Sequence, residues 1–157
     1  MPPSPSETIR VGAISVRFVL DAETSGGSAT AFECEVPANA VMSAAHSHDG
    51  FEETNYGLAG VTTFTVDGER RELHPGEVVF IPRGAVHSFE NRSDGDARFL
   101  AVATPGVFGR SYFKEIGAVL NAAEGGPPDR AAIGEVMRRH GLTPAMGPAG
   151  PAARRRR

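Results

Sequence analysis

The chain contains almost no cysteine, and this scarcity limits what can stabilise it. Cys34 is the single cysteine among 157 residues, so no internal disulfide can hold the fold together. It lies in residues 32–36, where apolar and acidic residues alternate as they do in a half-buried strand. Because Cys34 falls on the apolar side, we predict a buried structural thiol rather than a nucleophile or a ligand.

Long apolar runs are also missing. No stretch of 18 or more apolar residues occurs, and the first six residues contain neither a basic nor an apolar segment. A membrane-spanning helix needs about 20 mostly apolar residues, and a secretory signal needs both of those segments. We therefore expect no membrane association and a cytoplasmic location.

Positive charge is scarce outside the C-terminus. The formal net charge is −3 although Arg154 to Arg157 supply four positive charges, so the rest of the chain carries −7. An acidic surface repels a phosphate backbone. Nucleic acid is therefore not an expected partner, and a small molecule is.

Short segments with strand-like patterns, separated by turn residues, occupy most of the chain before residue 105. They cover residues 9–20, 32–36, 61–66, 70–73, 77–81, 86–91 and 98–104. Asp67-Gly68 between two of them is a strong signal for a two-residue hairpin. Regularly spaced short strands predict an all-β sandwich or barrel, and a jelly roll is one way such a chain protects its sheet edges.

Two helices are predicted after Pro105. Ser111 can cap the first, in which Phe113, Ile116 and Leu120 recur at helical spacing. The second begins at Asp129 and ends before Gly141, with His140 as a residue of the helix terminus. Because both have apolar faces, we expect them to pack on the outside of the barrel or to cover one of its mouths. A lid over a binding site is the alternative.

Three histidines and a carboxylate form the most informative pattern. His46 and His48 are two residues apart, so on a strand they share one face, with Cα atoms about 6 to 7 Å apart. Glu53 follows at an odd offset, but the turn-forming Asp49-Gly50 can reset the register and return Glu53 to the same centre. Glu52 is the competing carboxylate.

His87 is the third histidine of the pattern. It follows Pro82, which fixes the backbone angle φ, and Gly84, which permits a tight bend before the next strand. His87 can therefore approach the other two histidines from across a barrel. Three imidazoles and one carboxylate suit one divalent transition metal, and Fe, Mn, Ni, Cu and Zn all remain open. Four protein ligands leave coordination positions for water, dioxygen or substrate. His74, in a turn, is expected to be solvated.

Together these residues resemble the two motifs of the cupin superfamily over about residues 30 to 105. The first motif is matched by His46, His48, Glu53 and Gly60, and the second by Gly76, Pro82, Gly84, His87 and Asn91. Ala40 stands where the family has glycine, and Asn39 can take the left-handed turn position instead.

The resemblance implies an all-β double-stranded β-helix, that is, a jelly-roll cupin barrel with two C-terminal helices. The expected organisation is a disordered segment at residues 1–7, a barrel at 8–105, a helical extension at 106–141 and a disordered tail at 142–157. The family also implies a homodimer through an edge strand, for which residues 9–20 offer a long candidate.

A resemblance to small cupins of the quercetin-dioxygenase-like kind implies a metal-dependent dioxygenase acting on an aromatic or enolisable substrate. Glu53 would then be both ligand and catalytic base. The same ligand set permits a non-redox isomerase, lyase or hydrolase, and a barrel that only binds a small molecule. Phe89 shares a face with His87 and is the expected pocket residue, while Tyr56, Phe64 and Phe80 are expected as further barrel aromatics. Arg83 and Glu52 are candidates for a supporting or acid–base role.

Overall fold

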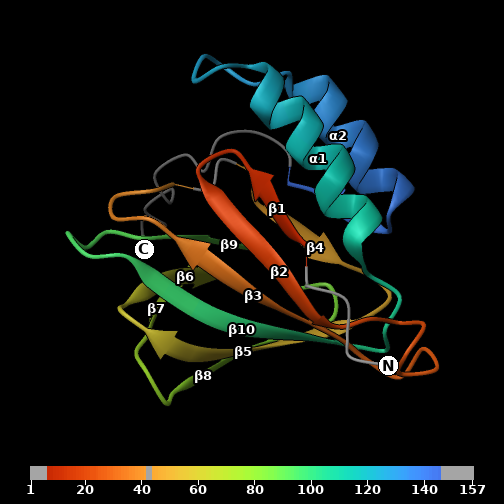
Figure 1. Ribbon diagram of the computed structural model, residues 1–157, viewed down its shortest axis with the longest axis horizontal. Coiled ribbons are helices and arrows are strands. Elements are labelled where there is room, and N and C mark those ends of the chain that lie inside the picture. Colours follow the sequence, from red (N-terminus) through yellow and green to blue (C-terminus); the bar gives the residue numbers. More distant parts are fainter. Residues whose placement is uncertain (1–6, 42–43, 146–157) are drawn as a thin grey trace, which may run out of the picture.

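The computed structural model describes residues 7–41 and 44–145. Within these ranges, eleven strands form two antiparallel sheets (Figure 1). The six-stranded sheet holds, in spatial order, β1 (Thr8–Val11), β2 (Ile14–Leu20), β3 (Thr30–Val36), β10 (Ala97–Thr104), β5 (Glu52–Ala59) and β8 (Val78–Ile81). The five-stranded sheet holds β11 (Leu142–Pro144), β4 (His46–His48), β9 (His87–Glu90), β6 (Thr62–Val66) and β7 (Glu69–Leu73).

The core lies between the two sheets, because each strand turns alternate side chains inward. In β10, for example, Ala97 and Phe99 are buried and Arg98 is exposed. The largest fully buried side chains include Phe18, Phe51, Phe64 and Phe99. Two antiparallel sheets closed around one apolar core confirm the predicted jelly-roll barrel.

The hairpin predicted at Asp67-Gly68 is present between β6 and β7, where Val66 pairs with Glu69. Asp67 and Gly68 both have positive φ, as the tight turn matching the twist of a hairpin requires. Asn39 also has positive φ, which confirms that it takes the left-handed position beside Ala40.

The long strand predicted at residues 9–20 is wrong. The chain reverses at Gly12 (φ 62°), so β1 and β2 form a hairpin in which Val11 pairs with Ile14. A positive φ is easy for glycine, and the alternation of apolar residues on either side of Gly12 concealed the turn. β1 is now the edge of the six-stranded sheet and helix α1 packs against it. The homodimer remains a prediction, but the single long edge strand at residues 9–20 that suggested it is not present.

The helices are α1 (Arg110–Ala122) and α2 (Arg130–Arg139), and they cover one end of the barrel (Figure 1). Asp129 caps α2 by accepting a hydrogen bond from the Ala132 backbone. The predicted cap Ser111 is wrong, because α1 already begins at Arg110 and its N-cap residue is Gly109. No helix among the described residues is both long and apolar enough to cross a membrane.

The predicted disordered tail begins too early at residue 142. Residues Leu142–Pro144 form β11, which pairs with β4 so that Leu142 lies opposite His48 and Pro144 opposite His46. Leu142 is almost fully buried, and the Thr143 hydroxyl donates to the Asp49 carboxylate at 2.7 Å. Gly141 (φ 78°) turns the chain after α2 and brings the next residues beside β4. The composition rich in proline and alanine did not reveal this strand. Residues 146–157 and 1–6 lie outside the described ranges.

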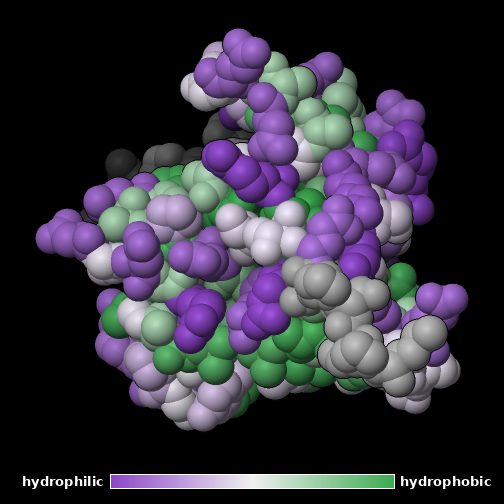
Figure 2. All heavy atoms as spheres, viewed as in Figure 1, coloured by the Kyte–Doolittle hydropathy of each residue, from purple (hydrophilic) through white to green (hydrophobic). Residues whose placement is uncertain are grey.

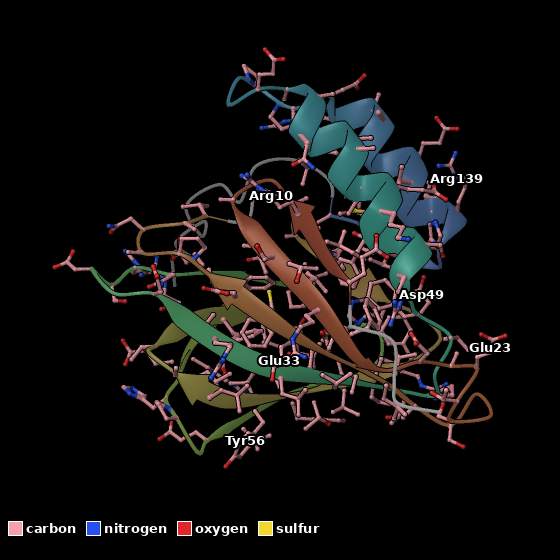
Figure 3. All side chains as sticks on the ribbon, viewed as in Figure 1. Arg10, Glu23, Glu33, Asp49, Tyr56 and Arg139 are labelled. Carbon is pink, nitrogen blue, oxygen red and sulfur yellow. The ribbon has the colours of Figure 1, made fainter. Side chains whose placement is uncertain are left out.

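The outer face of the six-stranded sheet carries an apolar strip over β5 and β8 (Figure 2). Tyr56, Val78 and Phe80 are 43%, 56% and 48% exposed there, and Figure 3 shows Tyr56 pointing away from the barrel. Tyr56 and Phe80, expected as barrel aromatics, therefore belong to barrel strands but face outward. Both sit at positions whose strand neighbours face inward, and alternation sends them to the outside.

Candidate metal centre

Three strands from both sheets bring His46, His48, Glu53 and His87 together. His46 and His48 lie on β4, and His87 is the first residue of β9, where it pairs directly with His46. Glu53 comes from β5 in the opposite sheet. The turn at Asp49-Gly50 separates β4 from β5, so the predicted change of register does return Glu53 to the histidines.

The four side chains meet at short range. The ligand atoms of the three histidines lie within 4.8 Å of one another, and His46 Nε2 is 3.1 Å from His48 Nε2. Glu53 Oε2 lies 3.7 Å from His48 Nδ1 and 3.6 Å from His87 Nε2. All the predicted ligands are therefore in one cluster, and their role as metal ligands stays a prediction.

The backbone fixes the orientation of two of the rings. His46 Nδ1 lies 3.1 Å from the Ala44 carbonyl, and His87 Nδ1 lies 3.0 Å from the Ala85 carbonyl. A carbonyl can only accept, so each Nδ1 carries the proton and each Nε2 presents its lone pair to the cluster. Such hydrogen bonds to the outer nitrogen are the usual means of orienting a metal-bound histidine.

His48 supplies evidence that the cluster fits a cation. Its Nδ1 is buried and has no hydrogen-bond partner among the described residues. Converging nitrogen lone pairs and a carboxylate repel one another unless a proton or a cation lies among them. Because three imidazoles and a carboxylate are also suitable ligands for a divalent first-row metal, the cluster could bind a transition metal.

Burial sets the protonation of the cluster. Burial, with a smaller contribution from the nearby His87, lowers the pKa of His46 to about 3 and of His48 to about 2. Burial also lowers the pKa of His87. It raises the pKa of Glu53 from 4.5 to about 7. The imidazoles are therefore neutral at pH 7, as ligation requires, while Glu53 is poised between its two forms.

The remaining candidates lie apart from this cluster. Glu52 and Arg83 form a surface ion pair, with Arg83 Nε 2.8 Å from Glu52 Oε1, so neither supports the site. His74 is exposed and pairs with Glu72, as expected for a turn residue. Asn91 is buried and donates to the Val36 and Gly95 carbonyls, so its role is structural.

A chamber of about 880 Å³ opens from the cluster towards the helices. Phe89 lines it, as predicted, and so does Phe64. Cys34 is buried, also as predicted, and this residue borders the same space. Burial raises the pKa of this thiol, which makes the thiolate rare and the group unreactive.

The helices contribute a part of this chamber that the sequence did not reveal. The contributing residues are Tyr112, Phe113, Ile116, Leu120, Ile133 and Met137, and Phe108 lines the chamber just before α1. Helical spacing predicted an apolar face that includes Phe113, Ile116 and Leu120, but an amphipathic pattern does not say what covers that face. The helices thus cover the mouth of the barrel above the cluster.

Comparisons with known proteins agree with the fold and the cluster. The family model of the cupin domain matches residues 32–103. The quercetin 2,3-dioxygenase of Bacillus subtilis (strain 168) is 33% identical over 72 residues, which are 46% of this chain and 21% of that protein. The oxalate-binding protein of Thermotoga maritima is 39% identical over 57 residues, or 36% and 47% of the two chains. The chain thus spans about a fifth and about half of these curated relatives.

A solved structure extends the similarity beyond the family match. The polyketide cyclase RemF from Streptomyces resistomycificus is 26% identical and has a TM-score of 0.57. The superposition covers 73% of this chain and 91% of the cyclase.

Proposed function

We propose that this chain, which belongs to the cupin superfamily through its domain at residues 32–103, is a metal-dependent enzyme acting on a small, largely apolar organic substrate. One observation carries the proposal: His46, His48, His87 and Glu53 converge at the floor of a roofed apolar chamber. A cluster at the floor of such a chamber faces any molecule that enters.

The four residues would hold one divalent transition metal. The three imidazoles offer neutral nitrogen donors, and Glu53 offers a carboxylate oxygen. When bound, such a metal supplies a Lewis-acid centre with coordination positions left for substrate and dioxygen. The chain itself supplies the dry surroundings that strengthen every charge interaction there.

Glu53 is the proposed catalytic base. Burial raises its pKa to about 7 when no cation is present, and a Glu53 carboxylate that left the metal would accept a proton and return it later. With its carboxylate 3.6 Å from His87, Glu53 lies at the boundary between the cluster and the chamber. It would remove a proton from a hydroxyl or an enolisable carbon of a substrate placed beside it.

Oxidative cleavage of an aromatic or enolisable compound is the specific reaction that we propose. The similarity to quercetin 2,3-dioxygenase supports it. The phenyl rings of Phe64, Phe89 and Phe99 also line the chamber and can pack against an aromatic substrate. A non-redox reaction is the second candidate. It is favoured by the similarity to a polyketide cyclase and requires only proton transfer by Glu53 beside a Lewis acid.

The first experiment measures metal content. Protein purified without chelator or His-tag should contain close to one transition-metal ion per chain by plasma mass spectrometry, whereas His87→Ala should contain little. His74→Ala is the matched control, since His74 is exposed and distant from the cluster, and it should retain its metal. Equal losses in both variants would contradict the ligand assignment.

The second experiment separates the two reactions. Oxygen uptake with a flavonol such as quercetin should be measured for the Fe, Mn, Ni and Cu forms. Uptake that disappears in Glu53→Gln supports the dioxygenase, and turnover of a substrate under anaerobic conditions supports the non-redox reaction. Absence of oxygen uptake in all four forms would remove the dioxygenase proposal.

A further inference from the structure

The chamber is larger and more apolar than a metal-binding cluster requires. Its volume of about 880 Å³ lies near the upper end for small-molecule sites, which span about 300 to 1,000 Å³. Among the described residues that line it, Arg10 is the only lysine or arginine. Arg10 is exposed and lies at the rim, beside the helices (Figure 3).

α1 contributes two polar residues to the chamber: Asn121, whose amide already bonds to Gly12 and Arg10, and Tyr112. Tyr112 is 5% exposed and borders the chamber. Among the described residues none hydrogen-bonds to its hydroxyl, and the fully buried polar atoms that lack a partner are His48 Nδ1 and Asn55 Oδ1, not this oxygen. The hydroxyl is therefore open to a hydrogen bond with a molecule in the chamber.

The ring of Tyr112 is held firmly from several sides. Its centroid lies 4.8 Å from that of Phe108, 5.2 Å from that of Phe113 and 5.6 Å from that of His140. His140 is in turn 3.3 Å from the Glu115 carboxylate. These contacts fix the direction of the phenol, so its hydroxyl is a positioned donor rather than a mobile one.

We propose that Tyr112 is a substrate-positioning residue: from the helical roof it donates a hydrogen bond to an oxygen of an uncharged, multi-ring compound whose rings fill the apolar chamber. This inference rests on the proposed function, because the compound is the substrate of the same site. The two C-terminal helices thereby decide which molecules fit.

The electrostatics of the roof support the same role. Burial and the charge of Glu53 raise the pKa of Tyr112, so the hydroxyl keeps its proton and remains a donor. Tyr112 and Glu53 both line the chamber. A substrate oxygen between them would lie against a donor on one side and a base on the other.

A small dianion such as oxalate fits the chamber poorly. It would leave most of the volume and the phenyl walls without contact, and apart from the proposed metal the chamber interior offers no cationic group to pair with its charges. The similarity to an oxalate-binding protein therefore does not extend to the helical roof.

The test compares two probes that differ in one oxygen. Binding of 3-hydroxyflavone and of flavone should be measured by fluorescence and calorimetry at equal metal content. In Tyr112→Phe, affinity for 3-hydroxyflavone should fall about five-fold, the usual effect of one lost hydrogen bond, while affinity for flavone stays within two-fold. A purely structural role for Tyr112 would weaken both probes equally, and that result would overturn the proposal.

Two further variants complete the test. The chain contains two tyrosines, and Tyr56→Phe, on the outer face of β5, is the matched control that should bind both probes as the wild type does. Leu120→Trp adds bulk at a half-buried position lining the chamber and should weaken both probes without loss of metal. Unchanged binding in Leu120→Trp would mean that the probes bind outside the chamber and would overturn the proposal.

The outcomes separate this inference from the proposed function. If 3-hydroxyflavone binds through Tyr112 but is not turned over, the positioning role stands and the dioxygenase proposal falls. If the protein holds its metal but binds oxalate more tightly than 3-hydroxyflavone, the positioning role falls and the metal centre stands.

Discussion

Glu53 is a predicted metal ligand whose carboxyl group is buried and has a pKa near neutral pH. Its side chain is 12% exposed and sits against His48 and His87, neither of which carries a positive charge at pH 7. In the absence of a cation, no positive charge in this pocket offsets the negative charge of an ionised Glu53. The group therefore titrates near pH 7 instead of near 4.5.

This shift predicts a pH dependence of stability in protein stripped of metal by a chelator. Between pH 4.5 and 7 the unfolded chain releases the Glu53 proton and the folded chain keeps it, so this group destabilises the fold increasingly as pH rises. The effect approaches about 3 kcal/mol above pH 7. Urea unfolding should show Glu53→Gln gaining stability over the wild type across this range.

Glu52→Gln is the control for that measurement. Glu52 is exposed, and Arg83 lowers its pKa, so its titration lies below pH 4.5. Its stability relative to the wild type should not change between pH 5 and 8. A flat difference for Glu53→Gln as well would show that Glu53 is not held protonated in the folded protein.

At the scale of elements, two glycines on the helices have opposite roles. Gly117 on α1 faces β1 so closely that a Cβ there would lie 2.5 Å from the Arg10 carbonyl oxygen. Gly134 on α2 would bring its Cβ only to the flexible end of Arg138, at 3.3 Å. Because Gly117 has no side chain, α1 can pack against the edge strand β1 and cover the chamber.

Gly117→Ala should therefore lower the free energy of unfolding by about 1 to 3 kcal/mol, because the helix must move away from β1. Gly134→Ala should leave it unchanged or raise it by up to about 1 kcal/mol, since alanine favours a helix and Arg138 can move aside. Thermal and urea unfolding of the two variants test this. A similar loss in both would mean that the α1–β1 contact is not tight.

At the scale of the whole molecule, the candidate metal centre joins the two sheets. His46, His48 and His87 belong to the five-stranded sheet and Glu53 to the six-stranded one, and β11 pairs with the strand that carries two of the histidines. A metal bound there would link three strands that are distant in sequence. Since the unfolded chain does not form this arrangement, binding should stabilise the fold as a unit.

Metal at 100 times its dissociation constant should add about 2.7 kcal/mol to the stability of the metal-free protein, which corresponds to a rise in Tm of about 5 to 10 °C. Differential scanning calorimetry with Mn²⁺ or Ni²⁺ measures the shift. His74→Ala should show the full rise and His87→Ala almost none. An equal rise in both variants would place the bound metal elsewhere on the surface.

The sequence by itself determined the strands, the Asp67-Gly68 turn and the shared face of His46 and His48, because strand geometry converts local patterns directly into faces and turns. The jelly-roll barrel, and Glu53 rather than Glu52 as the carboxylate, came from the resemblance of the sequence to the two cupin motifs. Local patterns also located both helices, to within a residue or two of their ends.

Only the tertiary structure decided what the helices cover, where the chain turns at Gly12, and that residues 142–144 join the sheet beside the histidines. Each of these depends on contacts between segments far apart in the chain, and a local pattern shows that a face is buried without naming its partner. Tyr112 acquired its place above the cluster in the same way. Its role follows from the packing of α1 over the barrel and from no motif in the sequence.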